Sequence, residues 1–150
     1  MKYNLTPQEK SNFCVCSALQ AILRSHGLEY TQDQIASRLN SSEDGSLIVD
    51  SMMEKFMSEN SFRYNHFYYN TTPFNEPDTL LREMDSHHGI IGIEMIGIGL
   101  HVFLLDEFKD PKLKVIDPKN GDVLNMDIYK LLRGMKDTNT GVFGLIKYIQ

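Results

Sequence analysis

Helical and strand patterns occupy different halves of this sequence, and that order constrains the fold more than any other feature. In the first half, apolar residues recur every three or four positions, as they do along one face of a helix. In the second half, β-branched and aromatic residues form short runs bounded by turn-forming residues, which is typical of strands. Parallel sheets come from alternating strands and helices, so this order predicts an α+β fold with an antiparallel sheet.

Five helices are expected, four of them in the first part of the chain. Ser11 or Asn12 offers a cap for the first helix, and Gly27 ends it. Thr31 and Gln34 have the spacing of a capping box, which fixes the start of the second helix. The predicted helices cover residues 13–26, 32–39, 47–57, 76–86 and 126–132, and residues 40–45 are predicted to form a loop.

The predicted strands cover residues 62–69, 90–96, 100–105, 113–116 and 142–149. Two of them flank a polar turn centred on Lys109 and are expected to pair as a hairpin in which His101 faces Asp117. Opposed side chains lie on one face with Cβ atoms about 4.5–5.5 Å apart, within reach of an imidazole–carboxylate hydrogen bond. A shift by one residue would place Ile116 opposite His101 instead. Because Pro118 follows Asp117, the alternative role of this aspartate is to start a turn.

The composition indicates one globular domain over residues 1–150, since the apolar fraction of 41% and the charged fraction of 23% are ordinary. A core of this size needs no disulfide or metal. The net charge is −5 and no run of Lys or Arg is present, so neither nucleic acid nor an anionic membrane is an expected partner. No apolar stretch reaches the about 20 residues of a membrane span, and the N-terminus lacks the apolar region of a secretory signal.

Two cysteines stand one residue apart, at Cys14 and Cys16, too close for an ordinary disulfide that closes a loop. This spacing and the missing signal predict a reducing, cytoplasmic location. No Cys-x-x-Cys or His-x-x-x-His pair is present, and neither a metal nor a cofactor is expected. His87 and His88 are expected at the polar end of the helix over 76–86.

Cys14 falls in the first turn of a predicted helix. The helix dipole and the unpaired backbone N–H groups there favour a thiolate, which makes Cys14 a candidate nucleophile. The alternative is that Cys14 is a small buried apolar residue, which is the role expected of Cys16.

The order of these residues resembles the papain-like cysteine peptidases, and most closely the branch that removes double-glycine leader peptides from bacteriocin precursors. Gln8 stands six residues before Cys14, and the chain continues from that cysteine into a helix rich in Ala and Leu. His101 precedes a β-branched and aromatic run, and Asp117 is followed by Pro118. The similarity covers the chain from Gln8 to the last strand. It implies the papain-like fold, with N-terminal helices packed on the antiparallel sheet.

Two features depart from the family pattern. The family usually has Gly directly after the nucleophile, whereas this chain has Val15, and a branched side chain there is expected to narrow the substrate cleft or to alter the oxyanion geometry. The family domain is often fused to a membrane transporter, whereas this sequence ends at Gln150 with no membrane span expected.

The resemblance implies a thiol protease that hydrolyses a peptide bond, with leader-peptide processing as its task. Cys14 would be the nucleophile, His101 the general base and acid, and Asp117 the group that orients the imidazole. Gln8 and the backbone N–H of Cys14 would stabilise the oxyanion. The expected partner is a peptide or protein substrate, and nothing in the sequence sets the oligomeric state.

Gly97 and Gly99, just before His101, are candidate substrate-binding residues because glycine allows a close approach of backbone, although they also serve to bend a loop. Two alternative functions use the same residues. The triad would act as an acyltransferase or amidase if an amine replaced water, or the scaffold would bind a peptide without cutting it. The presence of all four polar residues argues against a pure binding module, which needs no activated thiol.

Overall fold

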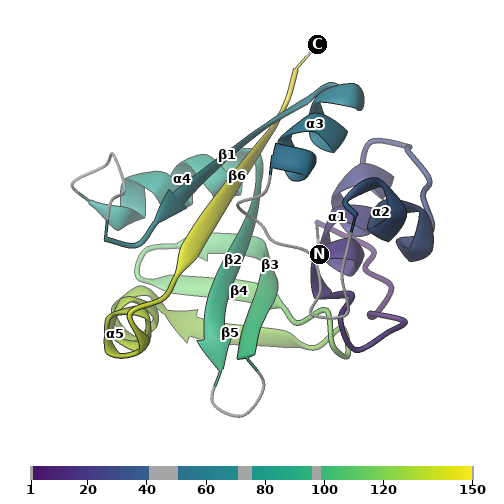
Figure 1. Cartoon of the computed structure of the whole chain (residues 1–150). Helices are drawn as coiled ribbons and strands as arrows, with labels where there is room; N and C mark the ends of the chain where they lie inside the picture. The colour runs from purple at the N-terminus through teal and green to yellow at the C-terminus, as the bar shows by residue number, and fades with distance from the viewer. Residues whose placement is uncertain (1, 41–50, 71–75, 96–98, 150) are drawn as a thin grey trace.

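Six strands form one fully antiparallel sheet in the order β1-β6-β2-β3-β4-β5 (Figure 1). A computed structural model describes residues 2–40, 51–70, 76–95 and 99–149. The strands are β1 (Phe62–Tyr68), β2 (His88–Met95), β3 (Gly99–Lys109), β4 (Lys112–Ile116), β5 (Val123–Asp127) and β6 (Val142–Tyr148).

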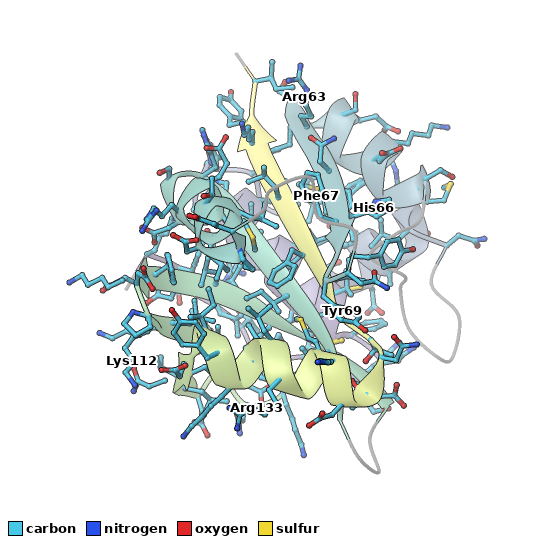
Figure 2. The ribbon with its side chains drawn as sticks, turned by 90° about the vertical axis from the view of Figure 1, so that its left-hand side faces the viewer. Arg63, His66, Phe67, Tyr69, Lys112 and Arg133 are labelled. Carbon is cyan, nitrogen blue, oxygen red and sulfur yellow. The ribbon has the colours of Figure 1, made fainter. Side chains whose placement is uncertain are left out.

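Helices cover both faces of this sheet and bury a separate apolar cluster on each (Figures 1 and 2). The N-terminal helices α1 (Cys14–Arg24), α2 (Gln32–Arg38) and α3 (Ser51–Glu59) share one cluster. The helices α4 (Pro77–Ser86) and α5 (Ile128–Thr138) share the other. The α+β class and the packing of N-terminal helices on an antiparallel sheet are therefore confirmed. Within the described part of the chain, no helix is both long and apolar enough to cross a membrane.

The helix boundaries follow local caps where the chain supplies them. The predicted capping box is confirmed, because Gln34 N–H donates to the Thr31 hydroxyl and the Gln34 side chain accepts from Thr31 N–H. The predicted cap of α1 is wrong, since Phe13 occupies the cap position and makes no side-chain cap bond. The predicted start of the third helix at 47, the loop at 41–45 and the strand end at 96 lie outside the described residues.

The helix predicted over 126–132 begins later and runs further, and it is preceded by a strand that was not predicted. Asp127 caps α5 by accepting the Tyr129 N–H at 2.8 Å, and the helix continues to Thr138. Residues Val123–Asp127 form β5, which pairs with β4. Three of the five β5 residues are exposed, so the strand lacks the apolar alternation that identifies a strand in a sequence.

The β3–β4 hairpin forms, but its register differs from the prediction by three residues next to the turn and by two at Leu104 and Leu105. Leu105 pairs with Val115, and the turn closes tightly after Lys109 pairs with Lys112. A β-bulge between Leu105 and Glu107 changes the register by one residue along the hairpin. Beyond the bulge the difference is an even number, so His101 and Asp117 stay on one face, as predicted.

Two hydrogen bonds between side chains connect Tyr3, near the N-terminus, to the start of β2 and to the residues that follow α1. The Tyr3 hydroxyl lies 2.6 Å from His88 Nδ1, and His88 Nε2 lies 2.8 Å from His26 Nε2. Two facing ring nitrogens share one proton, so both hydrogen bonds can form when both imidazoles are neutral. Burial, and to a smaller extent the nearby charges of Lys2, His26 and His87, lower the pKa of His88 to about 3.

We expect acid to weaken the fold through His88. An unfolded histidine binds a proton near pH 6.5, whereas folded His88 does so only near pH 3, so between these values the unfolded state binds more protons. Stability attributable to His88 is complete above pH 6.5 and falls by up to about 1.4 kcal/mol per pH unit below it. Urea unfolding at pH 7.5 and 5.5 should show a smaller pH dependence for His88→Gln than for the unmodified protein. His66→Gln is the matched control, and an equal pH dependence in all three proteins would contradict this assignment.

Candidate active site

Cys14 is the first residue of α1, and its side chain is half-buried. The two residues that follow point into the core, where Val15 is 1% exposed and Cys16 is fully buried. The expectation that Val15 narrows a cleft is therefore wrong, because its side chain packs among core residues. Cys16 has the buried position that was predicted for it, and both cysteines are free thiols. The prediction that Cys14 falls in the first turn of a helix is confirmed.

His101 and Asp117 meet where the β3–β4 pairing ends. The last β3–β4 pair is Leu104 with Ile116, and β3 continues beyond it toward Gly99. Extending the observed register makes His101 and Asp117 diagonal neighbours, a separation that long side chains bridge. His101 Nε2 lies 2.6 Å from Asp117 Oδ1, so the predicted imidazole–carboxylate contact forms although the two residues are not directly opposed.

The turn after β4 holds the Asp117 carboxylate in place. Lys119 N–H donates to Asp117 Oδ1 at 2.9 Å, and Gly121 N–H donates to the Asp117 backbone carbonyl at 2.7 Å. Gly121 has a φ of 81°, a conformation that favours glycine. The residue pair Asp117-Pro118 thus both starts a turn and presents a carboxylate, and the two alternative roles given to it are compatible.

Cys14 completes a series of hydrogen bonds with the same imidazole. The bond between Cys14 and His101 is the main cause that raises the pKa of His101, burial opposes it, and the bond to Asp117 raises the pKa further. Because Asp117 occupies Nε2, the nitrogen that remains for the thiol is Nδ1. The His101 ring is 7% exposed and packs edge-on against Phe103, with ring centroids 4.9 Å apart. Phe103 was missed in the sequence, although residues two apart in a strand share a face.

Gln8 lies near the turn that carries Asp117, and hydrogen bonds fix both its backbone and its side chain. Its backbone N–H donates to the carbonyl of Pro118 at 2.7 Å. Its side-chain amide donates to the carbonyls of Lys10 at 3.2 Å and Ser11 at 2.9 Å, in the loop that leads to Cys14. The other end of the amide, Oε1, is buried and has no hydrogen-bond partner among the described residues.

Of the two glycines predicted to bind substrate, the structure describes one. Gly99 begins β3 and pairs with Met95, two residues before His101. Gly97 lies outside the described residues. Among the residues that the structure describes, no group of three or more His, Cys, Asp or Glu side chains is arranged to hold a metal ion.

Comparison with known proteins finds a likeness in structure only. No protein-family model matches the chain, and no curated protein matches its sequence. The peptidase domain of Streptococcus ComA, a bifunctional ABC transporter of a quorum-sensing pathway, superposes with a TM-score of 0.72 at 14% identity, covering 99% of both chains. A double-glycine motif protease from an AMS/PCAT transporter, solved with its leader peptide, has a TM-score of 0.71 at 17% identity and covers 97% of this chain and 91% of that one.

A further structure, the peptidase domain of Streptococcus mutans ComA with a small-molecule inhibitor, has a TM-score of 0.56 at 12% identity over 96% of this chain and 98% of the other. The chain therefore has the papain-like α+β fold of these peptidase domains. The family resemblance seen in the sequence is confirmed at the level of the fold, over nearly the whole chain.

We expect Asp117→Asn to lower the pKa of His101. The negative charge of Asp117 and its hydrogen bond to the ring both favour the imidazolium, and a neutral amide removes the charge and weakens the bond. An NMR titration of the His101 ring proton measures this change. Asp122→Asn is the matched control, since it removes the same charge from the same turn and its side chain makes no described contact with the ring. A His101 titration that is identical in the Asp117 variant and the unmodified protein would show that the carboxylate does not act on this ring.

Proposed function

We propose that this chain is a cysteine peptidase that uses Cys14, His101 and Asp117 as its catalytic triad. The observation that carries the proposal is the continuous series of hydrogen bonds from the thiol through the imidazole to the carboxylate. A half-buried thiol at a helix start, next to an imidazole whose pKa is raised, places a nucleophile beside a base that can take its proton. The fold that it shares with peptidase domains supports the same reaction class.

In the proposed reaction, His101 Nδ1 takes the thiol proton and Cys14 Sγ attacks the carbonyl carbon of the scissile peptide bond. The C=O electron pair moves to the oxygen, and that oxyanion accepts hydrogen bonds from the Cys14 backbone N–H and from Gln8. Gln8 must turn one amide N–H away from its loop to do so. When the oxyanion collapses, the C–N bond breaks and His101 gives its proton to the leaving amine.

The thioester that remains is then hydrolysed. His101 takes a proton from water, and the resulting hydroxide attacks the thioester carbon. The C–S bond breaks, the carboxylic acid leaves, and the proton on His101 stays paired with the Cys14 thiolate. Asp117 remains ionised throughout and holds Nε2 of the ring, which fixes the tautomer that aims Nδ1 at the sulfur. An amine acceptor in place of water would give the acyltransferase alternative.

The proposed substrate is a peptide that carries a double-glycine leader sequence, because one structural neighbour is a double-glycine motif protease bound to a leader peptide. A cavity of about 850 Å³ beside α5, β2 and β5 offers room for part of such a peptide. Ile93 lines this cavity and pairs directly with His101 in the sheet, so the cavity begins one strand away from the imidazole. Apolar Met126, Leu131 and Met135 form much of its remaining wall.

We expect Cys14→Ala to abolish cleavage of a synthetic peptide that contains a Gly-Gly site, a loss of at least about 10³-fold in kcat, because the nucleophile is removed. Mass spectrometry of the products identifies the cleaved bond and separates a free acid from an amine adduct. Cys16→Ala is the matched control, since it removes a buried thiol from the same helix and should keep cleavage. Equal cleavage by the Cys14 variant and the unmodified protein would exclude Cys14 as nucleophile.

We expect Gly134→Leu to raise KM for the same peptide several-fold with little change in kcat. Gly134 lines the cavity, and a Cβ added there meets no atom within 4 Å, so the new side chain begins in open space at the cavity wall. Leucine is also a better helix former than glycine, so α5 should not be weakened. Arg133→Leu, an exposed position on the same helix, is the control. An unchanged KM in the Gly134 variant would place the substrate elsewhere.

A further inference from the structure

Gln32 is a fully buried polar side chain that contacts no member of the proposed triad. It is the first residue of α2, and the Thr31–Gln34 capping box fixes the start of that helix. A buried amide is costly unless each of its polar atoms finds a partner, so its partners show what it holds. All of the partners described for Gln32 except one belong to the N-terminal segment, residues 6–9.

The side-chain amide of Gln32 forms hydrogen bonds with the backbone on both sides of Gln8. Gln32 Nε2 donates to the carbonyls of Thr6 and Pro7, each at 3.1 Å, and Gln32 Oε1 accepts the N–H of Glu9 at 2.9 Å. The Gln32 amide thus bonds to three backbone groups, those of residues 6, 7 and 9, and leaves the side chain of Gln8 free of contact with it.

Three further hydrogen bonds fix Gln32 and Gln8 in place. Gln20 in α1 accepts from Gln32 Nε2 at 3.1 Å and donates to the carbonyl of Tyr30 at 2.9 Å, which fixes the Gln32 side chain against the helix that begins at Cys14. On the other side, the Gln8 N–H donates to the carbonyl of Pro118, the residue after Asp117. Hydrogen bonds therefore position Gln8 between α2, through its neighbours in the sequence, and the turn that carries Asp117, through its own N–H.

We infer that Gln32 is a positioning residue that sets the place of Gln8 as oxyanion donor, an inference that rests on the proposed peptidase function. Donors to an oxyanion act only at about 2.7–3.1 Å from the developing charge, so a small shift of the segment removes the contribution of Gln8. A side chain that both donates and accepts is required at position 32, because residues 6 and 7 present carbonyls whereas residue 9 presents an N–H. Glutamine supplies both at one end of a flexible side chain.

A double-mutant cycle tests this inference. Gln8→Ala should lower kcat by about 10²–10³-fold. Gln32→Met, which keeps the size of the side chain but loses its hydrogen bonds, should lower kcat by about 10-fold with KM changed less than about twofold. In the Gln8→Ala background, Gln32→Met should cause no further loss. If Gln32→Met lowers kcat by the same factor in both backgrounds, Gln32 does not act through Gln8 and the inference is overturned.

Gln32→Asn is a second variant in case the methionine variant folds poorly, because it stays uncharged and keeps an amide that is one methylene too short to reach residues 6, 7 and 9 together. Tyr30→Phe is the matched control: its hydroxyl bonds Asn60 at 2.8 Å, away from residues 6–9, so a similar loss of stability should leave kcat unchanged.

A readout that does not need activity separates this inference from the proposed function. In both Gln32 variants, the NMR signals of the Gln8 side-chain amide should move and exchange of the Gln8 backbone amide should quicken at least about 10-fold, with no change in Tyr30→Phe. Unchanged Gln8 signals would overturn the inference whether or not the protein cleaves peptides. A protein with no peptidase activity but with displaced Gln8 signals would refute the proposed function and support the placement of Gln8 by Gln32.

Discussion

The hydrogen bond between His101 and Asp117 is the contact on which the arrangement of the site depends, and a β-bulge makes it possible. Next to the turn, Lys109 pairs with Lys112, and continuing that register would set Asp117 opposite Leu104, on the other face from His101. The extra residue at Asp106 moves the register by one and returns the two side chains to one face. A hydrogen bond to the N-terminus stabilises the bulge, because the Asp106 carboxylate accepts the Lys2 backbone N–H at 3.0 Å.

The N-terminal segment joins the two parts that must meet at the site. It runs from Lys2 beside the sheet to Phe13 at the start of α1, and its hydrogen bonds alternate between the helical layer and the hairpin. Ser17 in α1 donates to the carbonyl of Thr6 at 2.6 Å, while Gln8 donates to Pro118. Because these partners lie on separate elements, the segment fixes the helix that carries the thiol relative to the turn that carries the carboxylate.

Local chemistry accounts for the features that the sequence predicted correctly. The Thr31–Gln34 capping box and the Asp117-Pro118 turn each depend on a few neighbouring residues, and helical periodicity sufficed to place Cys14 in the first turn of α1. The hairpin register was wrong by three residues next to the turn and by two beyond the bulge, because the place where a turn closes and a bulge both depend on how two strands fit together and have no strong signal in either. His88 was expected at a polar helix end, yet it opens β2 and is 8% exposed, because Tyr3 and His26 satisfy its ring nitrogens.

The sequence by itself determined the α+β class and the identity of the candidate groups, since hydrophobic periodicity and the order Gln8, Cys14, His101, Asp117 are properties of the chain alone. Only the tertiary structure decided how these groups meet: the diagonal contact of His101 with Asp117, the inward side chain of Val15 and the burial of Gln32. The reason is physical. Periodicity reports which residues seek the core, whereas strand register and the partners of a buried amide depend on segments far apart in the sequence.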